Sequence, residues 1–175
     1  MQNDDDIVFV IRKMYDLLYD EGAYAAIRYI RTIKSFSEYE KYYYISDVLK
    51  KLNRHERALN YINKALRFDK DVPFRNNKMY IYTTAKIEIL NSMSRYRTAV
   101  RISYNFRVHN KNFIKKNPLG IMEMHESFAY MMMGDPRKCM SVIPNVPHLA
   151  NIKIYIKNVE FESSHILAWC RKYMK

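Results

Sequence analysis

Residues 39–72 constrain the fold more strongly than any other stretch of this sequence. They read YEKYYYISDVLKKLNRHERALNYINKALRFDKDV, and apolar residues recur in both halves at the intervals of three and four that mark an amphipathic helix. Asn53 and Arg54 separate the halves, and Asn tolerates the left-handed conformation that ends many helices. Val72 precedes Pro73, where a helix cannot easily continue. The stretch is therefore predicted to form one helical hairpin.

Small side chains in this hairpin occur at the spacing that lets two helices pack closely, with a bulky residue beside them. The residues concerned are Ser46, Ala58, Ile62 and Ala65. This pattern resembles the tetratricopeptide repeat, although Leu49 stands where Tyr is usual and Lys70 where Pro is usual. The alternative interpretation is an unrelated helical hairpin within a bundle.

The small position that opens each second helix recurs along the chain, at Ala26, Ala58, Ala99 and Cys139. The intervals are 32, 41 and 40 residues, and connecting loops can absorb the excess because loop closure costs little extra entropy as length grows. Further helices are predicted over residues 7–21, 23–34, 79–93, 96–108 and 119–133, with Gly22 and Gly134 as stops. The pattern predicts an all-α fold, a right-handed stack of about four hairpins of the tetratricopeptide type, in one domain over residues 1–175.

The ends of several helices carry capping signals. Asp6 precedes the first helix, Asn117 precedes Pro118, and Asp135 precedes Pro136, so each is a predicted N-cap. The segment 109–117, HNKNFIKKN, is predicted to be a basic loop.

The last part of the chain is predicted to break at Pro144 and Pro147 and to resume over residues 151–156 and 160–173. The final helix should cap the stack, since a repeat array needs a terminal element to cover its last apolar face. Its expected buried stripe is Ile166, Leu167, Trp169 and Cys170.

Composition restricts the classes of partner and compartment. The net charge of +12 favours an acidic partner, and only 3 Gly and 5 Pro favour helices over tight turns. No apolar run reaches membrane-spanning length, and the polar start MQNDDD is unlike a signal peptide. Cys139 and Cys170 share no CxxC spacing and suggest reduced thiols. We therefore expect a cytoplasmic protein with no membrane partner.

Residues that would support catalysis or a cofactor are not arranged for it. His125 and Glu126 start an HExxH-like run, but Ala129 stands where the second His would be. With three isolated Gly, no loop can cradle a phosphate. Cys139 beside Lys138 is interpreted as a packed small residue, the alternative being a reactive thiol. The expectation is a protein that is not an enzyme and has no cofactor or metal.

The resemblance implies a concave face lined by the first helix of each hairpin, where a peptide or protein partner would bind. The residues mapped to this face are Tyr43, Asp47, Lys50, Thr84, Glu88, Asn91, Met124, Phe128 and Met131. Asn91 can pair with a peptide backbone, and methionines adapt to apolar ligands. Asp47 and Glu88 would repel the carboxylates that one variant of the family clamps, so a peptide with apolar and basic groups is expected.

A second candidate surface is basic. No acidic residue occurs from Ile89 to Met122, and cations interleave with Tyr96, Tyr104, Phe106 and Phe113. Cations with aromatic rings can hold single-stranded nucleic acid, or the stretch 95–116 can be a solvated basic face. The cations are Arg95, Arg97, Arg101, Arg107, Lys111, Lys115 and Lys116.

The rhythm of degenerate repeats, rich in Tyr, Asn and Lys, is similar to that of the peptide-sensing regulators of low-GC Gram-positive bacteria and their phages, of the Rap, Rgg and arbitrium-receptor type. The resemblance implies a non-enzymatic adaptor or regulator that binds a protein or peptide, with homodimerisation through an exposed terminal hairpin as one expected assembly. No helix-turn-helix precedes the repeats. The alternatives are a nucleic-acid-binding module and a small inhibitor that occludes a target enzyme.

Overall fold

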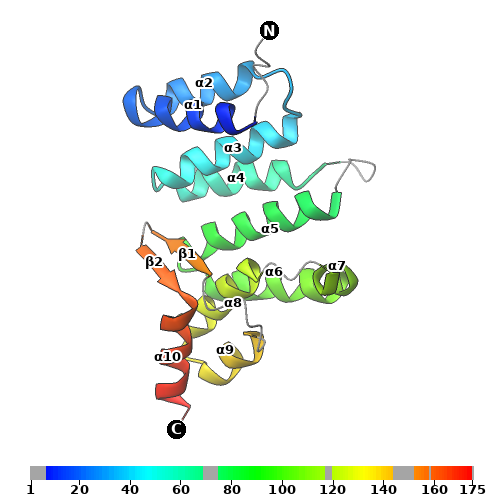
Figure 1. Cartoon of the computed structure of the whole chain (residues 1–175), viewed down its shortest axis with the longest axis vertical. Helices are drawn as coiled ribbons and strands as arrows, with labels where there is room; N and C mark the ends of the chain where they lie inside the picture. Colours follow the sequence, from blue (N-terminus) through cyan, green and yellow to red (C-terminus); the bar gives the residue numbers. More distant parts are fainter. Residues whose placement is uncertain (1–6, 69–74, 117–119, 144–151, 158, 175) are drawn as a thin grey trace. The chain divides into compact units, whose positions relative to one another are not determined.

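The computed structural model describes residues 7–68, 75–116, 120–143, 152–157 and 159–174. Helices account for most of these residues (Figure 1), as the sequence predicted. The chain divides into two compact units, residues 1–73 and 74–175. The prediction of one domain over residues 1–175 stays a prediction.

The first unit contains two helical hairpins. Its helices are α1 (Ile7–Asp20), α2 (Ala23–Thr32), α3 (Glu38–Lys51) and α4 (His55–Ala65). Helix α1 packs on α2 and α3 packs on α4, while α2 also contacts α3, so the two hairpins stack. The apolar stripes predicted from the spacing face inward, with Met14, Ile30, Ile45 and Ile62 buried.

The ends of α3 show how the sequence sets these hairpins. Ser37 begins the helix with a capping box, because its hydroxyl accepts from the Glu40 amide while the Glu40 carboxylate accepts from the Ser37 amide. Asn53 follows the helix with φ of 56°, as predicted. The Arg54 amide then donates to the Leu49 carbonyl over 2.9 Å, which completes a Schellman stop.

The second unit begins with α5 (Arg75–Ser92) and α6 (Tyr96–His109), followed by α7 (Lys111–Lys116), α8 (Ile121–Met132) and α9 (Pro136–Val142). The same stop recurs after α5 and α8. Ser94 and Gly134 adopt positive φ, and the amides of Arg95 and Asp135 donate back to the carbonyls of Leu90 and Tyr130.

The predicted small positions Ala26, Ala58, Ala99 and Cys139 are all fully buried. In α3, the Ser46 hydroxyl donates to the carbonyl of Ala58 over 2.9 Å. In α8, the carbonyl of Ser127 accepts from the thiol of Cys139 over 3.3 Å. These contacts confirm the predicted close approach of the paired helices.

The chain then forms an element that the sequence did not predict. Strands β1 (Lys153–Ile156) and β2 (Val159–Glu162) pair antiparallel, with Ile154 opposite Phe161. Burial alternates along β1, which buries Ile154 and Ile156 and exposes Lys153 and Tyr155. This period of two belongs to a strand, so the interpretation of residues 151–156 as a resumed helix was wrong. The helix predicted over residues 160–173 begins only at Ser163, because residues 160–162 belong to β2.

Helix α10 (Ser163–Tyr173) follows β2 and packs on α8 and α9, as a terminal helix was predicted to do. Ile166 and Cys170 are buried in a hydrophobic cluster that also contains Phe128. Leu167 and Trp169 are half-buried against this cluster.

The basic segment 109–117 also differs from its prediction as a loop, because α7 occupies most of it. The Phe113 ring packs against Tyr80 with ring centres 6.2 Å apart, which anchors this short helix to α5. Among the predicted N-caps, Asp135 is confirmed, since its carboxylate accepts from the Lys138 amide over 3.0 Å. Asp6 and Asn117 lie outside the described residues. The prediction of Asn117 as the cap of the following helix was wrong, because Gly120 is the residue that caps α8.

Replacing Ala58 with Leu should destabilise the protein by about 2 kcal/mol, because the position has no space for a larger side chain. Urea unfolding followed by circular dichroism measures the change. Ala168→Leu, at an exposed position of α10, is the matched control and should shift stability by about 0.5 kcal/mol or less. An unchanged urea midpoint for Ala58→Leu would contradict the close helix approach.

Candidate functional site

The predicted binding residues of α3 are engaged with one another. Asp47 accepts a hydrogen bond from the Tyr15 hydroxyl of α1 and forms an ion pair with Lys50 at 3.0 Å. Burial, together with the Asp47 carboxylate, raises the pKa of Tyr15 well above its usual value. Tyr43 lies half-buried beside Tyr44, with ring centres 5.1 Å apart. The Tyr15–Asp47 hydrogen bond joins α1 to α3, and the other two contacts lie within α3.

Three of the predicted binding residues in the second unit are core residues. Asn91 is fully buried, and its side-chain amide donates to the His125 carbonyl over 2.8 Å. Met124 and Phe128 are buried, and the Phe128 ring packs edge-on against Phe161 of β2 with ring centres 4.8 Å apart. The prediction that these three residues line an open face was therefore wrong. Thr84 is also buried, while Glu88 and Met131 remain half-buried.

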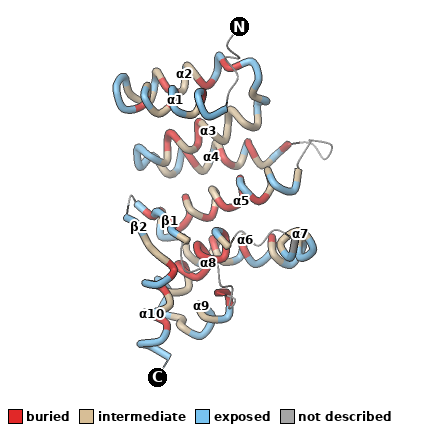
Figure 2. Tube along the Cα trace, viewed as in Figure 1, coloured by how far each residue is buried: buried red, intermediate tan, exposed pale blue. Residues whose placement is uncertain are grey.

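The reason lies in the surroundings of α8. This helix contacts α5, α6, α9, α10 and β1, so every residue from Met122 to Ala129 is buried (Figure 2). Its sequence, IMEMHESFAYMM, includes two carboxylates and a histidine within that buried run. Between Met122 and Ala129, α8 therefore has no face left for a ligand.

Arg107 is likewise not a free surface cation. Its guanidinium donates twice to Glu126 of α8, through Nε at 3.0 Å and Nη2 at 2.8 Å. The Ser103 hydroxyl donates to the same carboxylate over 2.6 Å. Because Glu126 is fully buried, this bidentate pair neutralises an internal charge and holds α6 to α8.

The other cations of the basic stretch lie mostly in solvent. Arg97, Arg101 and Tyr104 are exposed on one face of α6, as their spacing predicted. Tyr104 has 56% of its surface exposed, whereas Phe106 is buried. Exposed cations of the stretch also include Arg95, Lys111 and Lys115, while the Lys116 side chain lies outside the described residues.

The Cys139 thiol lies in the core, where it packs against its neighbours and is shielded from solvent. Cys139 is fully buried, and burial raises the pKa of its thiol well above the usual value, which opposes a reactive thiolate. Among the described residues, no cluster of three or more His, Cys, Asp or Glu side chains could hold a metal ion. Within the same ranges, no helix is long and apolar enough to cross a membrane.

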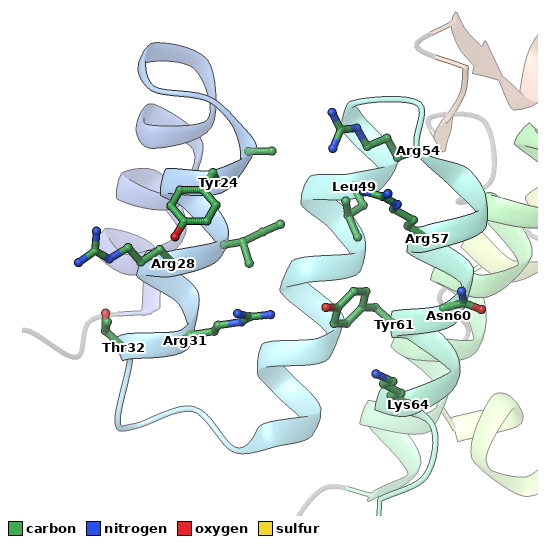
Figure 3. A pocket seen from close by; sticks show the side chains of 12 residues that line it. Tyr24, Arg28, Arg31, Thr32, Leu49, Arg54, Arg57, Asn60, Tyr61 and Lys64 are labelled. Atoms are coloured by element: carbon green, nitrogen blue, oxygen red, sulfur yellow. The ribbon is translucent and has the colours of Figure 1, made fainter.

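The candidate site is a groove in the first unit, between α2 and α4, with a volume of about 750 Å³ (Figure 3). Ile27 of α2 and the buried Leu49 of α3 give it apolar surface, and Tyr24 and Tyr61 add aromatic rings. Five cations line it: Arg28, Arg31, Arg54, Arg57 and Lys64. No acidic residue is among the described residues that line it.

The two walls face each other across this groove. In Figure 3, Arg31 extends from α2 toward Tyr61 of α4, whereas Arg28 extends toward the other side of α2. The Lys64 ammonium lies over the Tyr61 ring, 5.1 Å from its centre, which orients both side chains. The groove is thus a cationic channel with an apolar base, hereafter called the α2–α4 groove.

The arginines of the α2–α4 groove are not neutralised by acidic groups in the described part of the chain. Arg28, Arg31, Arg54 and Arg57 form no ion pair with any described acidic side chain. Like charges gathered beside apolar surface raise the local positive potential, and an anion bound there lowers it. Since guanidinium groups donate in pairs to carboxylates and phosphates, the site is suited to an anionic ligand.

The sequence contained a signal for this groove that was not used. Arg28 and Arg31 lie about one turn apart on α2, and Arg57 of α4 lies three residues after Arg54, which precedes that helix. The two pairs are separated in the sequence by α3, so they do not form a continuous basic stretch. Only the stacking of the two hairpins brings α2 beside α4.

Comparison of this chain with protein-family models, with curated proteins and with solved structures found no match. The assignment of the site therefore depends on its own residues.

Arg107→Ala should destabilise the protein by about 3 kcal/mol, because it leaves the buried Glu126 carboxylate without its cation. Arg101→Ala removes an exposed cation from the same helix and should change stability by about 0.5 kcal/mol or less. Urea unfolding of the two variants measures both effects. Equal stabilities would show that the Arg107 ion pair has no structural role.

Proposed function

We propose that this protein is a non-enzymatic adaptor or regulator that binds an acidic segment of a partner protein or peptide in the α2–α4 groove. One observation carries the proposal: among the described residues, five cations and no acidic side chain line a cavity with an apolar base. The resemblance of the hairpins to tetratricopeptide repeats supports it, since such repeats serve as binding scaffolds.

The charge of the groove changes the expected ligand. The concave face mapped from the sequence favoured a peptide with basic groups, but its residues are largely paired or buried. The α2–α4 groove combines exposed guanidinium groups with Ile27 and Leu49, so it favours a segment that has both acidic and apolar side chains. Apolar contact adds free energy that salt does not screen, whereas the ionic part weakens as salt rises.

Reversing two charges of the groove should abolish partner binding. The variant Arg31→Glu with Arg57→Glu places an acid on each wall, and we expect capture of the partner from a host lysate to be lost with the fold intact by circular dichroism. Capture is measured at low and moderate salt, with and without nuclease. The control, Arg12→Glu with Arg171→Glu, makes the same charge change at exposed positions outside the groove and should retain the partner.

Equal capture by both double variants would exclude the groove as the binding surface. Capture that disappears with nuclease would favour nucleic acid. If the captured partner is a single enzyme that loses activity in the complex, the adaptor is an inhibitor of that enzyme.

A second candidate function is nucleic-acid binding by the exposed face of α6. The observation that favours it is the alignment of Arg97, Arg101 and Tyr104 on a helix with no acidic residue. Cations on phosphates and a ring on a base are the contacts that hold single strands.

The variant Arg97→Glu with Arg101→Glu tests this second function. If each Arg contacts one phosphate, the slope of log affinity against log salt for single-stranded DNA should fall in magnitude by about 1.4. Fluorescence anisotropy of a labelled oligonucleotide measures it, with the Arg12 and Arg171 double variant as control. An unchanged slope would show that α6 does not contact the strand.

A further inference from the structure

The α2–α4 groove has two cationic ends. Helices α2 and α4 run in the same direction in Figure 3, so the start of α4 lies near the start of α2 and their last turns also lie near each other. Arg54 and Arg57 mark the first end, and Arg31 and Lys64 mark the second. Leu49 of α3 gives the groove apolar surface from between the two walls.

The length of the groove sets the spacing that a ligand would need. Lys64 follows Arg54 by ten residues and Arg57 by seven, which at a rise of ~1.5 Å per residue places it ~15 and ~10 Å further along α4. In an extended peptide, alternate side chains point to the same side at intervals of ~6.6 Å, so residues i and i+4 are ~13 Å apart. The ~13 Å between the two peptide side chains therefore lies between the ~10 Å from Arg57 to Lys64 and the ~15 Å from Arg54 to Lys64.

We propose that the α2–α4 groove recognises an extended peptide segment with acidic groups at positions i and i+4 and a large apolar side chain at i+2. The first acidic group binds at one cationic end, the second at the other, and the apolar side chain packs on Ile27 and Leu49 between them. This inference rests on the proposed function and adds the pattern of the ligand. A carboxylate or a phosphorylated side chain supplies the same anionic chemistry at either end.

Labelled synthetic peptides test the pattern by fluorescence anisotropy on the full chain. The reference peptide carries Glu-Ser-Phe-Ser-Glu within neutral residues. One comparison peptide has the same composition with the two Glu adjacent, a second replaces Phe with Ser, and a third replaces one Glu with phosphoserine. We expect the first comparison peptide to bind about fivefold more weakly than the reference, because it loses one partly exposed ion pair. The second should also bind about fivefold more weakly, because it loses the apolar contact. The third should bind at least as tightly as the reference.

A charge exchange identifies which end holds which acid. Lys64→Glu should weaken binding of the reference peptide about fivefold. Of two peptides in which Lys replaces either the first or the second Glu, only one should bind this variant as tightly as the reference peptide binds the unchanged protein. Arg12→Glu should leave all affinities unchanged, because Arg12 lies outside the groove.

The outcomes separate this inference from the proposed function. If all acidic peptides of equal charge bind alike and Arg57→Glu weakens them alike, the groove binds acidic segments but the spacing is wrong. If Arg57→Glu and Lys64→Glu change no peptide affinity, both the spacing and the proposed site are wrong. If single-stranded DNA of equal charge displaces the reference peptide from the groove and binds more tightly, the ligand is nucleic acid.

Discussion

The close approach of two helices within each hairpin is the constraint on which the rest of this structure depends. Ala26, Ala58, Ala99 and Cys139 leave no accessible surface, so the partner helix lies directly against each of them. A Schellman stop with positive φ precedes three of the four, and it fixes where one helix ends and the next begins. Small side chains and defined stops together set the packing of each pair of helices. Once two helices are paired in this way, their apolar stripes face the core.

Charge is treated in opposite ways in two parts of the molecule. In the second unit, the buried Glu126 carboxylate receives three hydrogen bonds, two from Arg107 and one from Ser103, because an unpaired charge inside a protein is costly. In the first unit, the guanidinium groups of the α2–α4 groove are exposed to solvent and form no ion pair with the acidic side chains that the structure describes. The Arg107–Glu126 ion pair stabilises the fold, whereas the arginines of the α2–α4 groove can bind a ligand.

Prediction from the sequence succeeded where one helix or one turn determines the result. The stops at Asn53 and Gly134, the cap at Asp135 and the exposed face of Arg97, Arg101 and Tyr104 depend on residues close together in the chain. It was wrong for residues 151–156, where the segment is short and Ile154 and Ile156 suit a strand as well as a helix. Phe128 was misplaced because part of its cover, including Phe161 of β2, comes from elements that follow α8 in the chain.

The sequence by itself determined the helical hairpins, since the period of apolar residues, the small positions and the stops are local properties of the chain. Only the tertiary structure decided which polar residues are internal and which face a ligand. Arg107 and Arg101 are indistinguishable by type and neighbourhood, yet one neutralises a buried carboxylate and the other meets water. The cations of the α2–α4 groove come from two helices separated by α3, and only packing brings them to one cavity. Burial and proximity between distant segments are decided by packing, which a local pattern does not encode.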